Sequence, residues 1–293
     1  MKRTLHYIIP QHFAPVTIEA FVRSHGFTSS IIKNLKQTEQ GVMVNQIWKH
    51  FWETIYPGDH LILTIDDQSN SANIVPSNRF LPIHYEDDDI LVINKDFDCP
   101  IHPSQNNYAN TLANAVQYYY LQQGEPFTFR CINRLDRDTT GLTVIAKHYS
   151  SAAKLSLSMK NRLIKRTYLA LVSGITPLCG TIDLPIGRVS GSTIERCIDW
   201  ETGEQAITHY QRLATKNGNS LISLNLETGR THQIRVHMKA IGHPLLGDGI
   251  YNPLDQSLPR QALHSYQLTF PHPVTGTICQ FMQPLPIDMA TLL

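Results

Sequence analysis

The chain lacks several features that would place it in a common class of protein. No apolar run reaches the roughly 18 residues that argue for a membrane-spanning helix, and the first residues lack a signal peptide's long apolar segment. The five cysteines are odd in number and contain no C-x-x-C pair, which fits reduced thiols better than a structural zinc site. These absences predict a cytoplasmic protein without a metal centre.

The chain also lacks a charge excess and the signatures of several reactions. Its formal net charge of +1 does not by itself favour a charged partner. Residues 187–193 have glycine and hydroxyl groups but not the lysine of a phosphate-binding loop, and neither G-x-S-x-G nor G-x-G-x-x-G occurs. The sequence therefore lacks the usual motifs of nucleotide hydrolases, serine hydrolases and dinucleotide-dependent oxidoreductases.

Basic residues are nevertheless clustered in one part of the chain. A cluster of this kind forms either a solvated helix face or a contact with an acidic partner, and composition alone favours the solvated face. The cluster lies between residues 154 and 166 and consists of Lys154, Lys160, Arg162, Lys165 and Arg166.

The first 75 residues predict a small unit of two helices followed by short strands. Thr17 is expected to cap the first helix, which ends at Gly26, and Ser29 or Ser30 is expected to cap the second. The apolar side chains that these helices bury are Ile18, Phe21, Val22, Ile31, Ile32 and Leu35.

Strands expected over residues 42–45 and 61–65 complete a pattern that resembles the alpha-L RNA-binding domain. Such domains usually carry arginines at the start of the second helix, where this chain has Ser30-Ile31-Ile32. The resemblance implies a domain over residues 1–75 with a weak grip on RNA phosphates. The polar stretch that follows predicts a linker, which we assign to residues 76–83.

Residues 84–293 favour an α+β domain with a largely antiparallel central sheet and flanking helices. A hairpin is expected at Asn217-Gly218, and Gly242 is expected to end a helix that contains Ile234 and Met238. No regular β-α-β alternation is present, so a doubly wound fold is not indicated. The other expected elements are strands over residues 90–93, 142–146, 167–172, 207–213 and 221–226, and a helix over residues 150–162.

Charged residues are dense in the segment INRLDRDTTGL, residues 132–142. It places Asp136 and Asp138 among Arg134 and Arg137, directly before an apolar strand. A carboxylate among guanidinium groups stays ionised and can act as a nucleophile or a base. The alternative is a salt-bridged surface loop, which composition alone favours.

A second dense segment, LETGRTHQIRVH, covers residues 226–237. On the helix that it opens, Arg235 and Lys239 share a face and could meet a phosphate or a carboxylate. His232 and His237 are five residues apart, which does not match the spacing of a helical zinc motif. We therefore interpret both as hydrogen-bonding or packing histidines.

Four segments together resemble the RluA family of pseudouridine synthases, over nearly all of residues 84–293. The resemblance implies the pseudouridine synthase fold and the isomerisation of selected uridines in ribosomal RNA or tRNA. It also implies a monomer that needs no metal or other cofactor. The segments are YEDDDILVINK, INRLDRDTTGLTVIAK, IKRTYLALVSG and LETGRTHQIRVHMKAIGHPLLGDGIYN.

The same resemblance implies roles for individual residues. The catalytic aspartate falls on Asp136, the active-site tyrosine on Tyr168 and the arginine that pairs with the aspartate on Arg235. The aspartate would either attack C1′ of the ribose or remove the 2′ proton, and the sequence leaves both routes open. The expected substrate contacts are Arg134, Ile234, Arg230 and Lys165.

Three departures from the family pattern leave these residues intact: Asn133 where histidine is usual, Thr140 in place of serine, and Asp96-Phe97-Asp98 in place of Pro-Ala-Gly.

Two other functions remain as alternatives. One is an RNA-binding protein without catalytic activity. The other is a nucleoside-cleaving hydrolase, which would need a water-activating base and usually a second acid, and no such pair is evident outside the loop of residues 136–138.

Overall fold

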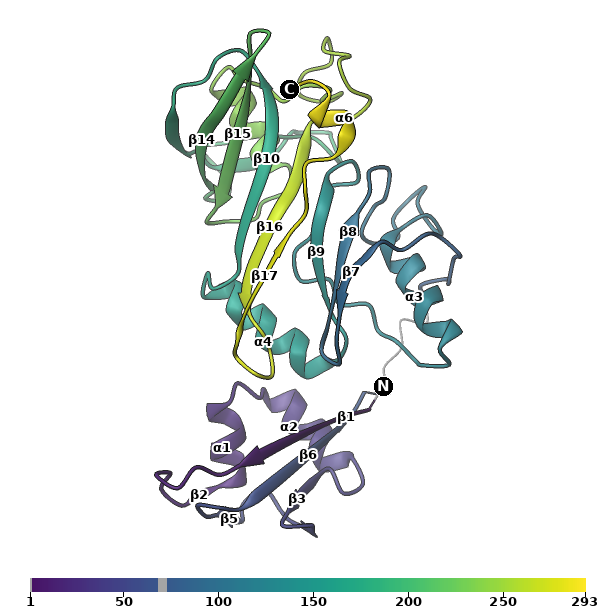
Figure 1. Cartoon of the computed structure of the whole chain (residues 1–293), viewed down its shortest axis with the longest axis vertical. Coiled ribbons are helices and arrows are strands. Elements are labelled where there is room, and N and C mark those ends of the chain that lie inside the picture. Colours follow the sequence, from purple (N-terminus) through teal and green to yellow (C-terminus); the bar gives the residue numbers. More distant parts are fainter. Residues whose placement is uncertain (1, 68–72) are drawn as a thin grey trace.

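The computed structural model describes residues 2–67 and 73–293 (Figure 1). Residues 2–67 form an antiparallel sheet in the order β1-β6-β3-β4, which packs with two helices around an apolar core of its own. Its elements are β1 (Lys2–Ile8), β2 (Val16–Thr17), α1 (Ile18–Ser24), α2 (Ser29–Gln37), β3 (Val42–Val44), β4 (Ile47–Trp48), β5 (Thr54–Ile55) and β6 (His60–Asp66). The expected helices and strands are present, but the sequence interpretation missed β1 at the edge of the sheet.

One of the two predicted helix caps is confirmed. The Thr17 side chain accepts a hydrogen bond from the Ala20 N–H at 3.2 Å, as expected for the cap of α1. The predicted cap of α2 at Ser29 or Ser30 is wrong, because Thr28 holds that position and Ser29 is already helical. The Ser30 hydroxyl instead bonds the hydroxyl of Tyr149, far along the chain.

The second part of the chain contains a nine-stranded sheet in the order β11-β14-β15-β10-β16-β9-β8-β7, with β17 beside β16. Every pairing described in it is antiparallel except that of β9 with β16. The strands are β7 (Ile83–Glu86), β8 (Ile90–Lys95), β9 (Thr140–Ala146), β10 (Lys165–Ser173), β11 (Cys179–Asp183), β14 (Ile207–Lys216), β15 (Asn219–Leu226), β16 (Leu263–Pro271) and β17 (Ile278–Met282). The expectation of a largely antiparallel sheet is confirmed.

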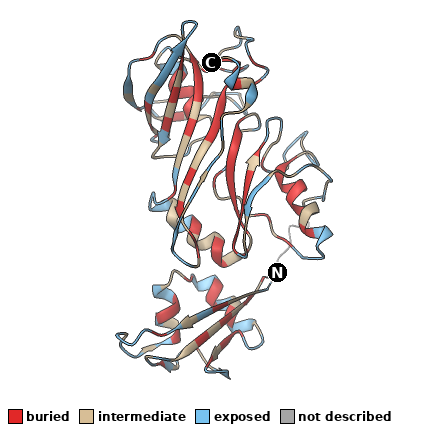
Figure 2. Ribbon diagram, viewed as in Figure 1, coloured by how far each residue is buried: buried red, intermediate tan, exposed pale blue. Residues whose placement is uncertain are grey.

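The helices of this part are α3 (Leu112–Gln122), α4 (Tyr149–Lys160), α5 (Gln233–Ala240) and α6 (Ile287–Ala290), and a small ribbon is formed by β12 (Ile186–Arg188) and β13 (Arg196–Ile198). Figure 2 shows buried residues along β8, β9 and β10. None of the helices in the described ranges is long and apolar enough to cross a membrane.

The parallel pairing of β9 with β16 joins the two halves of the sheet through two residue pairs, His264 with Thr140 and Ser265 with Gly141. Gly141 has a φ of +104°, and a Cβ at this position would lie 2.3 Å from the Ser265 carbonyl oxygen. Only glycine permits this close approach. The backbone directly after the charged loop is therefore fixed against β16.

The segment predicted to be a linker contacts α3, a helix that the sequence interpretation missed. Asn114 donates a hydrogen bond to the Val75 carbonyl at 2.7 Å, and the Ser77 N–H donates to the Asn114 carbonyl at 3.1 Å. Part of the polar stretch before it, residues 68–72, lies outside the described residues. Residues 75–77 are thus held on the second part of the chain.

Buried ion pairs connect the first part of the chain to the second. Arg3 on β1 donates to both oxygens of Asp89, at 3.0 and 2.8 Å, and His148 contacts the same carboxylate at 2.5 Å. Asp67 pairs with Arg130 at 2.7 Å. Since Asp89 is only 3% exposed, its partners replace the water that this carboxylate loses on burial.

We predict that Asp89→Asn lowers the free energy of unfolding by about 3–5 kcal/mol, because the guanidinium of Arg3 would lose the buried carboxylate that pairs with it. Asp88→Asn is the matched control, since Asp88 also contacts Arg3 but is 77% exposed, and it should change stability by about 1 kcal/mol or less. Urea unfolding of the full chain measures both. Equal effects of the two changes would contradict the assignment.

The same carboxylate predicts how stability depends on pH. Burial opposes ionisation, but the hydrogen bonds from His148 and Arg3 dominate and lower the pKa of Asp89 below its ordinary value. A lowered folded-state pKa stabilises the fold above the unfolded carboxyl value of about 4, and this stabilisation is lost as the pH falls below it. Unfolding measured between pH 7 and pH 3 should therefore show a smaller acid dependence for Asp89→Asn than for the unmodified chain.

Candidate active site

The loop that carries Asp136 is fixed on both sides by buried polar groups. The Asn133 side chain donates to the Leu142 carbonyl at 3.1 Å and accepts from the Val144 N–H at 2.8 Å, which ties the loop to β9. On the other side, the buried Lys95 donates to the Arg137 carbonyl at 2.8 Å. Asn133, which departs from the family pattern, therefore serves to hold the loop backbone.

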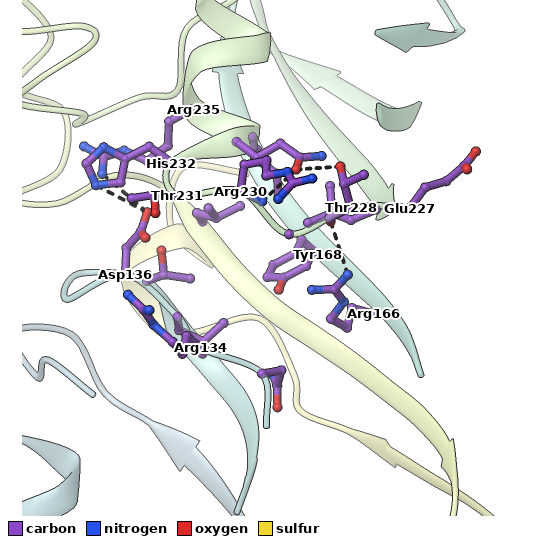
Figure 3. A pocket seen from close by; sticks show the side chains of 18 of the residues that line it. Arg134, Asp136, Arg166, Tyr168, Glu227, Thr228, Arg230, Thr231, His232 and Arg235 are labelled. Atoms are coloured by element: carbon purple, nitrogen blue, oxygen red, sulfur yellow. Dashed lines mark hydrogen bonds and ion pairs between the residues drawn. The ribbon is translucent and has the colours of Figure 1, made fainter. Parts of the chain in front are cut away.

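Asp136 lies beside Arg235, as predicted, and Arg235 has a second and closer carboxylate partner. The Arg235 Nη1 lies 3.4 Å from Oδ2 of Asp136, while its Nε and Nη2 bond the two oxygens of Asp248 at 2.7 and 2.8 Å. The open choice between phosphate and carboxylate for Arg235 is thus resolved in favour of carboxylates. Figure 3 shows Arg235 and His232 close to Asp136 at one side of the pocket.

The sequence interpretation missed Asp248, although this residue lies in the last of the four segments that resemble the family. Its carboxylate is fully buried and also accepts the N–H groups of Ile250 and Tyr251, each at 3.0 Å. The signal was an aspartate between Gly247 and Gly249, a spacing typical of a tight turn. The sequence does not reveal that this turn contacts α5.

The inner ion pair stays charged although it is buried. Burial opposes ionisation of Asp248, but hydrogen bonds from Arg235 and backbone N–H groups lower the pKa of this carboxyl. Burial also disfavours the charged guanidinium, but Asp248 and Asp136 raise the pKa of Arg235. Burial lowers the pKa of His232, so its ring is neutral near pH 7 and Arg235 supplies the positive charge beside Asp136.

Tyr168 on β10 and Ile234 on α5 are both buried and line the same cavity as Asp136. The cavity has a volume of about 620 Å³. This volume falls within the roughly 300–1,000 Å³ of typical ligand pockets. Burial raises the pKa of the Tyr168 hydroxyl, which therefore stays protonated at neutral pH. The pocket offers a carboxylate, a phenol and apolar walls to one bound group.

The two histidines of the second dense segment are hydrogen-bonded, as expected. His232 Nδ1 lies 2.9 Å from the Tyr251 hydroxyl, and His237 is buried between the Thr208 hydroxyl at 2.9 Å and the Leu184 carbonyl at 3.0 Å. His232 also has a φ of +57°, in the left-handed region, at the N-terminal end of α5. This backbone conformation turns the chain directly into the helix that carries Arg235.

Several cations border the pocket. Among the residues that the structure describes, Arg134, Lys160 and Arg166 line it without an ion pair to a carboxylate. Arg230 lines it too, but its guanidinium bonds Glu204. Lys165, the remaining expected substrate contact, is exposed at the start of β10 and does not line the pocket.

Arg166 lies beside Tyr168, and its side chain is partly buried (Figure 3). Its Nη2 donates to the Thr228 carbonyl at 3.2 Å, and its Nε is buried without a hydrogen-bond partner in the described part of the chain. Two other members of the basic cluster have partners elsewhere, since Lys154 lies over the Phe27 ring and Arg162 pairs with Glu227.

Comparisons with known proteins match this chain to one family. The family model described as RNA pseudouridylate synthase matches residues 89–240. A Bacillus subtilis (strain 168) protein named "Uncharacterized RNA pseudouridine synthase YjbO" is 37% identical over 95% of this chain and 98% of its own length. The "Ribosomal large subunit pseudouridine synthase D" of Nitrosomonas europaea is 40% identical over 78% of this chain and 68% of its own.

Solved structures show the same fold. "Human RNA Pseudouridylate Synthase Domain Containing 1" matches with a TM-score of 0.58 at 29% identity, over 70% of this chain and 83% of that chain. The chain therefore belongs to the RNA pseudouridylate synthase family, within its RluA branch, and is an isomerase that converts uridine in RNA to pseudouridine.

Proposed function

We propose that Asp136 is the catalytic carboxylate of this isomerase and that Arg235 and Tyr168 act with it on the target uridine. One observation carries the proposal: Asp136 is the carboxylate that meets both a buried guanidinium, at 3.4 Å, and the cavity lined by Tyr168 and Ile234. A surface salt-bridge loop, the alternative at the sequence level, would have no reason to face such a cavity.

Pseudouridine formation breaks the bond between N1 of uracil and C1′ of the ribose and makes a bond between C5 and C1′. In one route, Asp136 attacks C1′ as the uracil leaves, and C5 of the rotated uracil then displaces the carboxylate and loses its proton. In the other, Asp136 removes the 2′ proton as the uracil leaves, C5 adds to C1′ of the resulting glycal, and a proton returns to C2′. In both routes C5 finally loses its proton and N1 gains one. Both routes start from an ionised Asp136.

The reaction gains and loses no atoms or electrons overall, so these residues supply its chemistry without an oxidant or a nucleotide. Arg235 holds the anion of Asp136 in place. The protonated Tyr168 offers an aromatic face and a hydroxyl for proton transfer, and Ile234 packs against the base. These roles explain why Asp136, the Tyr168 phenol and the apolar Ile234 line one cavity.

The target uridine must leave its stack to enter the cavity, which costs a few kcal/mol that contacts to the RNA backbone and base offset. We propose that Arg134, Lys160 and Arg166 supply backbone contacts around the pocket and that Arg230 and the exposed Lys165 extend them. Cations without a carboxylate partner remain available for phosphate, and Arg166 offers donors beside the proposed site of the base.

We propose ribosomal RNA of the large subunit as the first substrate to test and tRNA as the second. The observation that favours ribosomal RNA is the set of relatives named ribosomal large subunit pseudouridine synthase D, at 39–40% identity over about four fifths of this chain. Pseudouridine mapping in both RNA classes, from cells with and without the gene, identifies the target.

We expect Asp136→Asn to reduce pseudouridine formation to background, because asparagine has nearly the same shape but no charge. RNA affinity should stay within the same order of magnitude. Single-turnover conversion of the mapped RNA and a filter-binding titration measure the two properties. Asp138→Asn, two residues along the same loop, is the control and should retain conversion. Full turnover by Asp136→Asn would refute the assignment, and release of free uracil would indicate a hydrolase.

We expect Arg235→Met to lower the single-turnover rate by about 10²–10³-fold, the usual effect of removing one preorganised charge donor. It should also destabilise the fold, because Asp248 would be left as an unpaired buried anion. The double change Arg235→Met with Asp248→Asn removes both charges and should recover stability but not the rate. If the double variant regained the rate, Arg235 would act only through the fold.

We expect Lys160→Gln and Arg166→Gln to weaken RNA binding and to reduce the log–log slope of affinity against salt by roughly 0.7–0.9 for each lost phosphate contact. Lys216→Gln is the matched control. Lys216 ends β14 at the opposite end of the hairpin from Leu226, which lines the pocket. If the pocket variants and Lys216→Gln had the same salt slope, this result would contradict the proposed contacts of Lys160 and Arg166 with RNA phosphates.

A further inference from the structure

Three aromatic rings form an exposed stack on the first part of the chain, from Trp48 at the end of β4 to Trp52 just before β5. The rings of His50 and Trp52 are stacked with centroids 4.1 Å apart and an interplanar angle of 12°. Trp48 meets His50 edge-on at 4.2 Å. Trp48 is 51% exposed and Trp52 is 71% exposed, so one ring face remains available to a ligand.

The backbone beneath this stack is held rigidly. The Glu53 N–H donates to the His50 carbonyl at 3.0 Å, and the Glu53 carboxylate accepts the His50 N–H at 2.7 Å and the Lys49 ammonium at 2.7 Å. Phe51, which lies between His50 and Trp52 in the sequence, is buried in the core, and the ammonium of Lys36 lies over its ring. Because the protein segment that carries these rings is already ordered, binding of a ligand to them would cost little conformational entropy of the protein.

The first part of the chain has little free charge with which to hold RNA. Residues 2–67 contain six lysines and arginines and six aspartates and glutamates. Arg23 and Lys49 form ion pairs with Glu19 and Glu53. A contact with RNA on this part of the chain must therefore depend on stacking more than on phosphate neutralisation.

The stack also lies away from the second part of the chain. Figure 1 shows β3 and β5, the neighbours of this segment, at the end of the first part that points away from the larger sheet. The contacts that join the two parts come from other residues, among them Arg3, Ser30 and Asp67. A ligand on the rings would not compete with these contacts.

We propose that Trp48, His50 and Trp52 form a stacking platform for unpaired bases of the RNA substrate, at a distance from the uridine that reacts. The proposal rests on the proposed RNA substrate, since an RNA long enough to reach both places is what would bind there. Any base presents a π-face to such rings, so the platform selects single-stranded RNA over duplex without reading sequence.

The test uses the full chain and two labelled probes, a twelve-nucleotide oligouridine and an RNA duplex of the same length. Trp48→Ala with Trp52→Ala should weaken binding of the oligouridine by about tenfold or more, leave the duplex affinity unchanged and leave the salt slope unchanged. The matched control is Trp200→Ala. Trp200 is 73% exposed and lies in the second part of the chain, so its removal should change neither affinity.

A second measurement does not require the double variant to fold. The chain has three tryptophans, Trp48, Trp52 and Trp200, so the Trp200→Phe variant reports on the platform alone. Oligouridine should quench its fluorescence, and the duplex should not. Absence of quenching would overturn the proposal, as would equal losses for both probes or a change in self-association measured by sedimentation.

Uridine conversion by the unmodified chain is measured separately. If the unmodified chain converts no uridine of large-subunit ribosomal RNA, the proposed substrate fails whatever the stacking results show. If pseudouridine forms while the platform variants bind oligouridine normally, only the platform proposal fails.

Discussion

A single guanidinium shared between two carboxylates is the interaction on which the pocket depends. Arg235 binds the buried Asp248 through two hydrogen bonds and still presents Nη1 to Asp136 at 3.4 Å. A buried ion without its partner destabilises a protein by several kcal/mol, so the three groups must be in place together. The loop that carries Asp136, α5 and the turn of residues 247–251 are thereby fixed relative to one another. The carboxylate of Asp136 is therefore held in position before RNA binds.

The three segments meet because the halves of the sheet join between β9 and β16. The loop with Asp136 ends directly at Gly141, whose missing side chain allows the backbone of β9 to reach Ser265. On the other side of the join, β10 carries Tyr168 next to β16. The glycine at position 141 therefore has a structural cause, because a side chain there would push β9 away from β16 and separate the two sides of the pocket.

Local patterns in the sequence predicted local structure well, as at the hairpin of Asn217-Gly218, where both residues have positive φ, and at Gly242 after α5. They did not predict which segments meet. Asp136 and Arg235 are 99 residues apart, and composition alone favoured a surface loop for the first of them. Only the family resemblance paired them, and nothing local marked Asp248 as their third partner. Periodicity reports burial and turns, whereas contacts between distant segments depend on the sheet order.

The net charge of +1 conceals an uneven distribution of available charge. On the first part of the chain, Glu19 and Glu53 neutralise neighbouring cations, and the rings of Trp48 and Trp52 are exposed. Around the pocket, Arg134, Lys160 and Arg166 have no such partner among the described residues. Extruding a base requires favourable contacts close to the base that moves, and ionic contacts with phosphate supply them there. Farther away, stacking adds affinity without increasing the repulsion between cations that a uniformly basic surface would carry.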